Sequence, residues 1–452
     1  MFEKDFYLEH PSVTARPLAD VDAFRARHHI AVSGRDPPKP AFTFEEASFP
    51  AYITSQLASA GFPAPTAVQS QTWPAALSGR DVVAVAETGG GKTLAFLLPA
   101  LVHVNAQPYL NPGEGPIVLV LAPTRELASQ IHAECAAYGA SSRVKSVCVY
   151  GGAPRGPQIA ALRAGAEVVV ATPGRLNDLV AAGATNLRRC ALLVLDEADR
   201  MLDLGFEPQI RKLVDRTRPD RQTMLFTATW PRQVADAARA FARDAVVVRV
   251  GVVDAAATSR GVSHVVRRVE EEGKYAALVR ALEEALGAED TGAGRVIVFL
   301  SSKARVDDAT RRLRRDGFPA LSIHGDKSQE EREFVLTEFR EGRAPVMLAT
   351  DVAARGLDVK DVTLVVNHDF PGTMEDYVHR AGRTGRAGAS GTATSFFTAA
   401  DSRHAPRLEA TLREAGQTPP EWLRELVRGE RAREDRLGNA LGGGRRRFSE
   451  AT

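Results

Sequence analysis

The sequence predicts an α/β protein built from two doubly wound, mostly parallel sheets. Short apolar runs without polar alternation recur along the chain, and such runs are typical of strands buried on both faces of a parallel sheet. Helical stretches separate these runs, and the alternation occurs twice, on either side of a weakly patterned segment over 251–262 that we interpret as a linker. The chain has 452 residues, enough for two to three domains of about 100–200 residues each.

The composition is globular, with 44% hydrophobic and 25% charged residues, which argues against a disordered or membrane-spanning class. No apolar run reaches the roughly 20 residues that span a bilayer, and Met1 to Asp5 lack the layout of a signal peptide. We therefore expect neither membrane association nor secretion. The three cysteines form no C-x-x-C pair, which favours a reducing compartment over a disulfide or zinc framework. Because the formal net charge is only +2, any nucleic-acid site must be local.

Residues 1–41 are weakly periodic and rich in proline and charge. We interpret them as an N-terminal extension, an extended arm with one short helix near Asp20 to His28. The first domain is expected over 42–250 and opens with an amphipathic helix that ends at Ala60 and Gly61. Thr66, after Pro65, is typical of a helix start.

Gln69 follows this helix start, and its side chain carries both a donor and an acceptor. An amide can pair two edges of an adenine at once, as it does in DNA grooves. The alternative, an ordinary solvated helix glutamine, remains open from the sequence alone.

Residues 86–93 follow an apolar run, Val82 to Val85, and lead into a second apolar stretch that is typical of a helix. Strand, glycine loop, Lys-Thr and helix is the layout of a phosphate-binding loop. Glycines let backbone N–H groups approach an anion closely, Lys92 can reach terminal phosphates, and the Thr93 hydroxyl can bind magnesium. Ala86 stands where the strict pattern has glycine, so a chance match is the alternative.

Four further strands of the first domain end in polar residues. The strands are expected at 117–122, 167–171, 192–195 and 223–226. Ligands collect at the carboxyl ends of parallel strands, so these polar tails should converge on one edge. Asp196 can hold magnesium and Glu197 can orient or deprotonate an attacking water, although two acids are also favourable at a plain helix N-terminus.

The second domain is expected over 263–423, with strands at 295–300, 320–323, 345–349 and 362–366. The segment His379 to Arg386 is rich in arginine, but Gly382 and Gly385 argue against a plain solvated helix. From 424 to 452 arginines outnumber carboxylates, and we expect a disordered basic tail. Contact with RNA phosphates and simple solvation are equal alternatives for that tail.

Taken together, these segments resemble the motif set of the DEAD-box RNA helicases. Asp196-Glu197-Ala198-Asp199 spells the signature of that family. The other matching segments are Phe44, Gly61 to Gln69, Ala86 to Thr93, Pro123 to Ala128, Thr172 to Arg175, Thr227 to Thr229, Leu348 to Asp358 and His379 to Arg386. The resemblance runs from about Phe44 to Leu423. It implies two tandem RecA-like domains joined by a flexible linker, with the activity of an ATP-dependent RNA helicase and ATPase.

The resemblance also implies a role for each matching residue. Phe44 would stack on adenine and Gln69 would read its edge, so that ATP is preferred over GTP. The full nucleotide-binding set is Phe44, Phe62, Thr66, Gln69, Ala86, Glu87, Thr88, Gly89, Gly90, Gly91, Lys92, Thr93 and, at the ribose, Asp358. Thr93 and Asp196 would hold magnesium. The catalytic set is Lys92, Asp196, Glu197 and two arginine fingers, Arg383 and Arg386, and the coupling set is Asp199, Thr227, Thr229 and His379.

RNA contacts are expected opposite the ATP, from backbone N–H groups, hydroxyls and single arginines, which suit sugar-phosphate binding without sequence reading. The matching residues are Pro123, Thr124, Arg125, Gly151, Gly152, Thr172, Pro173, Gly174, Arg175, Gln329, Arg332 and Thr350. The arm segments 6–11 and 30–40 resemble the nuclear branch of the family, which implies a nuclear location and partners in RNA–protein particles. We expect a monomer.

Four residues depart from the usual family pattern. Gly90 and Thr227 stand where serine is common, Ala67 where proline is common, and His368 where tyrosine is common. None removes a catalytic group, so they bear on rates and not on the type of reaction. The sequence leaves one rival function open, an ATP-gated RNA clamp that rarely unwinds, whereas Gln69 and the tetrad Asp196 to Asp199 argue against a second rival, a DNA translocase.

Overall fold

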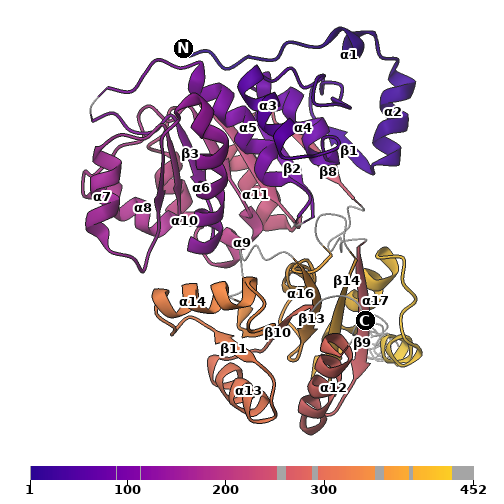
Figure 1. Cartoon of the computed structure of the whole chain (residues 1–452). Coiled ribbons are helices and arrows are strands. Elements are labelled where there is room, and N and C mark those ends of the chain that lie inside the picture. Colours follow the sequence, from indigo (N-terminus) through magenta and orange to yellow (C-terminus); the bar gives the residue numbers. More distant parts are fainter. Residues whose placement is uncertain are drawn as a thin grey trace, which may run out of the picture. The chain divides into compact units, whose positions relative to one another are not determined.

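The computed structural model describes residues 2–87, 89–111, 113–251, 261–287, 294–351, 361–385 and 390–429. The chain divides into two compact units, whose main parts are residues 2–251 (unit 1) and 261–429 (unit 2). Each unit contains one parallel sheet with helices on it (Figure 1), which confirms the predicted α/β class with two doubly wound sheets. The predicted linker lies mostly outside the described residues.

Unit 1 contains an eight-stranded sheet with the order β1-β8-β2-β7-β6-β3-β5-β4. All neighbouring strands are parallel except β1 and β8. The strands are β1 (Ile30–Ser33), β2 (Val82–Val85), β3 (Val118–Leu121), β4 (Ser146–Val149), β5 (Val168–Ala171), β6 (Leu192–Leu195), β7 (Gln222–Thr227) and β8 (Val246–Val250). Those predicted in this unit were found, whereas β1, β4 and β8 were not predicted.

Successive residues of a strand point to opposite faces of the sheet, and in this sheet apolar residues lie on both faces. Helices therefore cover both faces. One face packs against α3 (Ala51–Ser59), α4 (Ala67–Leu77), α5 (Lys92–Asn105) and α6 (Arg125–Gly139). The other packs against α7 (Arg155–Arg163), α8 (Pro173–Ala181), α9 (Ala198–Asp203), α10 (Glu207–Val214) and α11 (Arg232–Phe241). Each face has its own core, so the sheet is the buried middle layer and only its strand ends are free for ligands.

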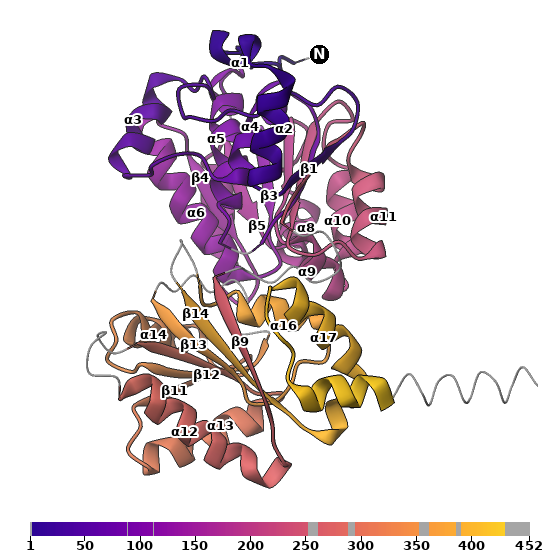
Figure 2. The ribbon, with the colours of Figure 1, turned by 90° about the vertical axis from the view of Figure 1, so that its right-hand side faces the viewer.

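The N-terminal arm is more structured than the sequence predicted. It contains α1 (Pro11–Ala15), α2 (Leu18–Arg27) and β1 (Figure 2). The strand β1 pairs antiparallel with β8. The predicted short helix corresponds to α2. The prediction of an otherwise extended arm was wrong, because its elements are stabilised by contacts with distant residues that local sequence does not reveal.

Unit 2 contains a six-stranded parallel sheet with the order β11-β12-β10-β13-β14-β9. Its strands are β9 (Val262–Arg268), β10 (Arg295–Phe299), β11 (Ala320–Ile323), β12 (Val346–Ala349), β13 (Val362–Asn367) and β14 (Gly391–Phe397). Its helices are α12 (Lys274–Leu286), α13 (Lys303–Arg315), α14 (Gln329–Arg340), α16 (Met374–Ala381) and α17 (Ala405–Glu414). The core on one face joins α12 and α13 to the sheet.

Two expected boundaries differ from the structure of unit 2. The strand β9 begins at Val262, which the sequence placed in the linker. Residues 421–429 are helical, so the expected disordered tail does not begin at Arg424. Trp422, in this helix, packs its ring 5.6 Å from that of Phe397, and this contact explains why the segment is ordered.

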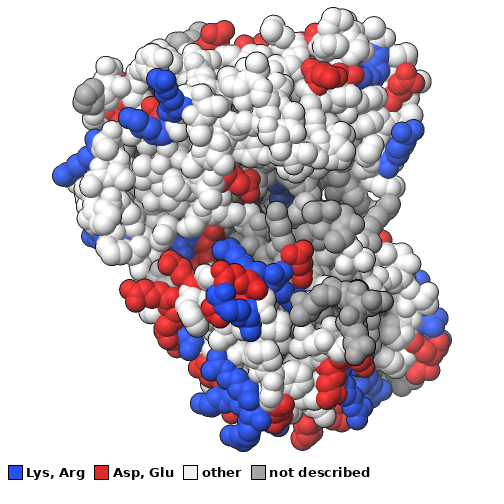
Figure 3. Space-filling view, viewed as in Figure 1, with Lys and Arg blue, Asp and Glu red and all other residues white. Residues whose placement is uncertain are grey.

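The charged surface is uneven (Figure 3). Lysine and arginine side chains gather over α13, whose last turn carries Arg312, Arg314 and Arg315. Carboxylates appear over α14, whose first turn carries Glu330 and Glu331. In the ranges that the structure describes, no helix is both long enough and apolar enough to cross a membrane.

His103, on α5, is a buried histidine, and neither of its ring nitrogens has a hydrogen-bond partner among the residues that the structure describes. Phe2 and Phe6 of the arm contact it edge to face, with ring centroids 5.5 and 5.7 Å away. Burial lowers the pKa of His103 to about 4. The imidazole is therefore neutral in the folded protein and acts as an apolar ring that anchors the arm.

We expect acid to destabilise unit 1 through His103. Below its ordinary pKa the unfolded chain binds a proton that the folded protein excludes, so stability falls as the pH falls from about 6.5 towards 4. At pH 5 the loss amounts to about 2 kcal/mol. Urea unfolding at pH 7.5 and pH 5.0 should show a smaller pH effect in His103→Phe than in wild type.

His264 in unit 2 serves as the internal control. Burial also lowers its pKa to about 4, so its own pH dependence should persist in His103→Phe. An unchanged pH dependence of unit 1 in the variant would contradict the assignment.

Candidate active site

The predicted phosphate loop connects β2 to α5 in unit 1. The strand is buried along its length, and the helix begins at Lys92, directly after Gly91. Gly89 and Gly91 have φ of 85° and 88°, in the left-handed region that side chains rarely adopt. A Cβ atom on Gly91 would lie 2.7 Å from Gln69 Nε2 and 2.8 Å from Thr66 Oγ1. Glycine at 91 therefore lets the residues expected to read adenine approach those expected to hold phosphate.

Lys92 is folded back onto this loop. Its Nζ donates to the carbonyl oxygens of Ala86, at 2.6 Å, and Glu87, at 3.0 Å. Burial lowers the pKa of Lys92, and the charge of Asp196 opposes that shift. Phosphate oxygens would make stronger, charge-assisted hydrogen bonds than these neutral carbonyls. An anionic ligand can therefore displace the carbonyls and recruit the ammonium.

Gln69 is 5% exposed, so the solvated alternative was wrong. Its Oε1 accepts from Thr66 N and its Nε2 donates to Gly91 O, both at 3.0 Å. The amide thus links the start of α4 to the phosphate loop. Of the two aromatic residues expected nearby, Phe44 is half-buried and Phe62 is exposed.

Asp196 and Glu197 follow β6, and α9 begins directly after them, at Ala198. The two acids therefore lie at a helix N-terminus, as the first interpretation requires, and also at a strand end, as the catalytic interpretation requires. Glu197 has φ 49° and ψ 53°, left-handed values that are uncommon outside glycine and that cluster at functional sites. Burial, followed by the charge of Glu197, raises the pKa of Asp196 to about 7. A buried acid beside a backbone in this conformation favours the catalytic interpretation.

Magnesium fits this group of residues. The carboxylates of Glu197 and Asp199 act on Asp196, and Lys92 supplies the opposing positive charge. A divalent cation would offset the surplus negative charge and keep Asp196 ionised. Within the described ranges, no three carboxylate, imidazole or thiolate side chains converge as a metal cage. Magnesium needs no such cage, because it commonly takes one or two carboxylates, water and substrate phosphates.

Asp199 joins the end of β6 to the end of its neighbour β7. Its Oδ2 accepts from Thr229 N at 2.9 Å and from Thr229 Oγ1 at 2.7 Å. Thr227 Oγ1 donates to Thr229 O at 2.9 Å, and all three residues are buried. Three of the residues expected to couple the ATP site to RNA therefore form one hydrogen-bonded chain between adjacent strand ends.

The residues expected to bind ATP and those expected to bind RNA in unit 1 lie along the same sheet edge. The phosphate loop, the acids and the coupling threonines follow β2, β6 and β7. The RNA set follows the next three strands in the sheet order: Pro123, Thr124 and Arg125 after β3, Thr172, Pro173, Gly174 and Arg175 after β5, and Gly151 and Gly152 after β4. The two sets of candidate residues are therefore neighbours in the strand order, and the placement of RNA opposite the ATP stays a prediction.

Local contacts position the candidate RNA residues. Thr124 caps α6 through its hydroxyl. Arg175 Nη1 donates to Ala153 O at 3.0 Å, which ties α8 to the turn after β4. In that turn Gly152 has φ 80°, and a Cβ there would lie 3.0 Å from Arg125 Nη1. The turn after β4 is thus held between two arginines from the neighbouring strand ends.

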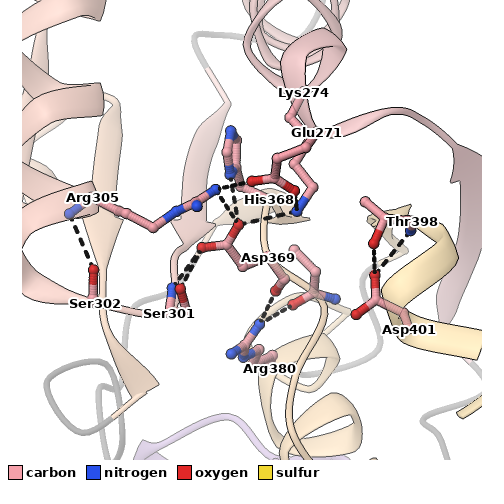
Figure 4. A network of polar contacts seen from close by, with 11 residues as sticks. Glu271, Lys274, Ser301, Ser302, Arg305, His368, Asp369, Arg380, Thr398 and Asp401 are labelled. Carbon is pink, nitrogen blue, oxygen red and sulfur yellow. Dashed lines mark hydrogen bonds and ion pairs between the residues drawn. The ribbon is translucent and has the colours of Figure 1, made fainter. Parts of the chain in front are cut away.

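In unit 2, Asp369 is the centre of a polar network near the end of β13 (Figure 4). It accepts from Ser301 N and Oγ at 2.8 Å, from Arg305 Nη2 at 2.8 Å, and from Lys274 Nζ and His368 Nδ1 at 3.2 Å. Burial alone would raise the pKa of Asp369, but these hydrogen bonds hold it far below its usual range. Asp369 was not predicted from the sequence, although an aspartate two residues beyond a buried strand was the available signal.

Arg380 ties this network to the predicted motifs of unit 2. Its Nε and Nη2 donate to the two carboxylate oxygens of Asp351, at 2.5 and 2.7 Å, and its Nη1 donates to Asp369 O at 2.7 Å. Asp351 directly follows Thr350, at the end of β12. Arg380 therefore connects Asp351, the residue after the candidate RNA residue Thr350, to α16, the helix that carries His379.

The remaining predicted residues are placed as follows. Arg383 lies just after α16, and its Nε donates to His379 O at 3.2 Å. Thr93 is the second residue of α5, and Arg332 lies on α14. Thr88, Asp358 and Arg386 lie outside the described residues, as does the side chain of Gln329.

Comparisons with known proteins agree with this arrangement. The DEAD/DEAH box helicase family model matches residues 66–237, and the helicase conserved C-terminal domain model matches residues 273–388. The ATP-dependent RNA helicase DBP2 of Chaetomium thermophilum is 55% identical over 427 residues, which cover 94% of this chain and 76% of the relative. The chain belongs to the DEAD-box RNA helicases.

Two further comparisons support this placement. DBP2 of Scheffersomyces stipitis is 54% identical to the helicase over 442 residues, which cover 98% of this chain and 83% of the relative. The structure of S. cerevisiae Dbp5 bound to RNA and ADP BeF3 matches with a TM-score of 0.72 at 27% identity, covering 86% of the helicase and 99% of that chain. The tandem RecA-like architecture is thereby shown for this chain.

Gly90 is the departure from the family pattern that bears most directly on the phosphate loop. A Cβ at this position would lie 3.2 Å from Glu87 O, one of the two carbonyls that hold Lys92. Serine would therefore crowd the loop in its present conformation. We expect Gly90→Ser to disfavour this conformation, in which Glu87 O accepts from Lys92, and to favour a conformation that is open around phosphate.

Equilibrium binding of ATP should show this effect. We expect Gly90→Ser to lower the Kd for ATP about threefold, which corresponds to about 0.6 kcal/mol. Gly156→Ser is the matched control, because a Cβ at Gly156 meets open space. A weaker affinity in Gly90→Ser, with Gly156→Ser unchanged, would show that serine disturbs the phosphate-bound loop instead.

Proposed function

We propose that the helicase is an RNA-stimulated ATPase that locally unwinds short RNA duplexes without reading their sequence and remodels RNA–protein particles. The observation that carries this proposal is the shared sheet edge of unit 1, where the candidate ATP and RNA residues follow neighbouring parallel strands. The hydrogen bonds between Asp199 and Thr229 join two of these strand ends. The relatives named ATP-dependent RNA helicase support the same activity.

The nucleotide would be bound from both sides of the phosphate loop. Phe44 stacks on the adenine, and Gln69, already beside Gly91, reads its edge. Lys92 exchanges its two carbonyl acceptors for the terminal phosphate oxygens. Glu197 orients the attacking water and accepts its proton. Support for these roles comes from Gln69 and Lys92, whose side chains hydrogen-bond to residues of the loop.

Magnesium would be held by Asp196 and the Thr93 hydroxyl together with phosphate oxygens, and it supplies charge stabilisation when bound. Arg383 and Arg386 act as arginine fingers, which contribute about 10³–10⁵ in rate in related phosphoryl transfers. Both belong to unit 2, so hydrolysis requires residues from the two units. Asp358 contacts the ribose.

RNA binds through hydroxyls, backbone N–H groups and single arginines, a set suited to the sugar-phosphate backbone. The candidate RNA residues are also shared between the units. ATP and RNA therefore favour the same closed state, and each ligand strengthens binding of the other by the same factor. Closure bends one strand and separates a few base pairs, and phosphate release reopens the protein.

We place this activity in the nucleus, in a monomer that works with RNA–protein particles, since the arm resembles the nuclear branch of the family.

Glu197→Gln tests the proposed chemistry. The amide cannot take a proton from water, so we expect RNA-stimulated kcat to fall at least about 100-fold, while ATP and RNA affinities stay within about threefold of wild type. The measurements are ATPase rates with and without RNA, and displacement of one strand from a short RNA duplex. Glu207→Gln is the matched control, since Glu207 is half-exposed on α10 and forms an exposed ion pair with Arg211.

The wild-type protein decides between the rival functions in the same assays. Equal ATPase rates with and without RNA would refute the proposal. Stimulation by DNA as strong as that by RNA would indicate a DNA translocase. ATP-locked retention on single strands without strand displacement would indicate an RNA clamp.

A further inference from the structure

The segment that carries Phe44 is a turn between the arm and α3, without helix or strand over residues 41–50. Few backbone hydrogen bonds hold it: Ala41 N donates to Ser70 O at 2.9 Å, and Ser48 N donates to Glu45 O at 3.1 Å. Phe44 itself touches the core only with part of its ring, which lies 6.1 Å from the ring of Trp73. Side chains must therefore supply most of the order in this segment, which we call the adenine loop (residues 41–47).

The arm contacts the adenine loop through Glu46, a residue of that loop. The carboxylate is buried and accepts from Phe42 N at 2.6 Å, from Ser12 Oγ at 2.9 Å and from Arg16 Nη2 at 2.5 Å. Burial would raise the pKa of Glu46, but these hydrogen bonds outweigh it and lower the pKa. Glu46 is thus held as a carboxylate by two arm residues, one on α1 and one just after it.

Arg16 also holds the adenine loop in two other ways. Its Nη1 donates to Pro40 O at 2.9 Å, and its guanidinium lies 3.5 Å from the centre of the Phe42 ring. The ring of Phe42 also stacks on Phe24 of α2, with ring centroids 4.0 Å apart and planes 15° apart. A guanidinium over an aromatic face, with that ring stacked on another, fixes both the height and the tilt of the ring.

A second set of contacts ties the arm to α4, the helix that carries Gln69. Arg25 Nε donates to Gln71 Oε1 at 3.0 Å, and Gln71 Nε2 donates to Pro38 O at 2.8 Å. Figure 2 shows α2 next to α4 in unit 1. The two proposed adenine-binding residues, Phe44 on the loop and Gln69 on the helix, are therefore braced by one arm.

We propose that Arg16, with Ser12 and through Glu46, is a positioning residue for ATP: it holds the adenine loop so that Phe44 is preorganised to stack on the base. The proposal rests on the proposed ATP-binding role of Phe44. A loop ordered in advance does not have to be ordered by the ligand, so its affinity for the ligand is higher. A side chain that contacts a ligand keeps its position only when neighbouring residues fix its conformation. The arm then acts on ATP binding and leaves the hydrolytic step unchanged.

The test removes the ion pair without leaving a buried charge. In Arg16→Met/Glu46→Gln both charges are absent, and the new amide oxygen can still accept from Phe42 N. We expect the Kd and KM for ATP to rise about tenfold while kcat at saturating ATP and RNA stays within about twofold. The Kd is measured with a ribose-labelled ATP analogue. Gln107→Ala is the matched control, because it removes another arm contact, to Glu3 O at 2.8 Å, away from the adenine loop.

A double-mutant cycle with Phe44→Ala separates positioning from general loosening of unit 1. If the arm acts through Phe44, then Arg16→Met/Glu46→Gln should weaken ATP binding in wild type but by less than about twofold in Phe44→Ala. An equal loss in both backgrounds, or a lower kcat with unchanged KM, would overturn the proposal. Should the paired variant fail to fold, Ser12→Ala carries the same test with a smaller shift, since it removes one of three donors to Glu46.

The cycle also distinguishes this inference from the proposed function. If the wild-type protein binds ATP but shows no stimulation by RNA, the function fails while the binding cycle still reports on the arm. If wild type shows RNA-stimulated turnover and the paired variant binds ATP normally, the function stands and the positioning role is refuted.

Discussion

The buried charges at the ends of β2 and β6 set the constraint on which the rest of unit 1 depends. Asp196, Glu197 and Asp199 bring three carboxylates to this place, and Lys92 brings one ammonium. A protein interior tolerates such charges only when they are paired, hydrogen-bonded or neutralised. Asp199 accepts hydrogen bonds from Thr229, whereas burial and the charge of Glu197 raise the pKa of Asp196 to about 7, and Lys92 donates to two carbonyl oxygens. Carboxylates therefore outnumber the ammonium at this place, and a cation bound here would relieve their mutual repulsion.

The parallel sheet makes this concentration of charge unavoidable. Every strand of unit 1 from β2 to β8 ends at the same edge, so the loops that carry polar residues have one place to meet. Strand order then decides which chemistry lies next to which, and it places the acids after β6 directly beside the first candidate RNA loop, after β3. The arm closes the opposite end of the strand order, because β1 pairs with β8 and covers an edge that would otherwise offer unpaired backbone groups.

How much the sequence could reveal follows from which interactions are local. Buried strands such as β2 and β6 are continuous apolar runs, and the helix start at Thr66 carries its own signal, so these were predicted. In contrast, β9 alternates buried residues with exposed ones at the edge of its sheet, and β14 contains threonine and serine, so neither has the apolar run expected of a central strand. The fit of Gln69 against Gly91, 22 positions away in the chain, depends on packing that no local pattern encodes.

The same distinction explains why the arm was read as extended. Arg16 and Glu46 are 30 positions apart, and each is an ordinary charged residue until the fold brings them to 2.5 Å. The residues expected to be catalytic carry a sequence signal, because that chemistry requires particular residue types at fixed spacing, whereas a supporting contact can be built from many pairs. A supporting contact such as that between Arg16 and Glu46 is therefore visible only in the structure.

Asp196 and Asp369 show how the same position in a parallel sheet can serve opposite purposes. Both are buried aspartates just beyond the end of a central strand. Asp369 is surrounded by donors, and its pKa is far below the usual range, so its charge is fully compensated within unit 2. Asp196 lies among other acids, and its pKa is raised. A compensated carboxylate gains nothing from a cation and serves to hold Arg305 and Lys274 in place, whereas an uncompensated one gains from any cation that reaches it. The two aspartates therefore differ in their surroundings, since donors hold Asp369 in a polar network of unit 2 whereas Asp196 lies among acids in unit 1, although both sheets end in aspartate.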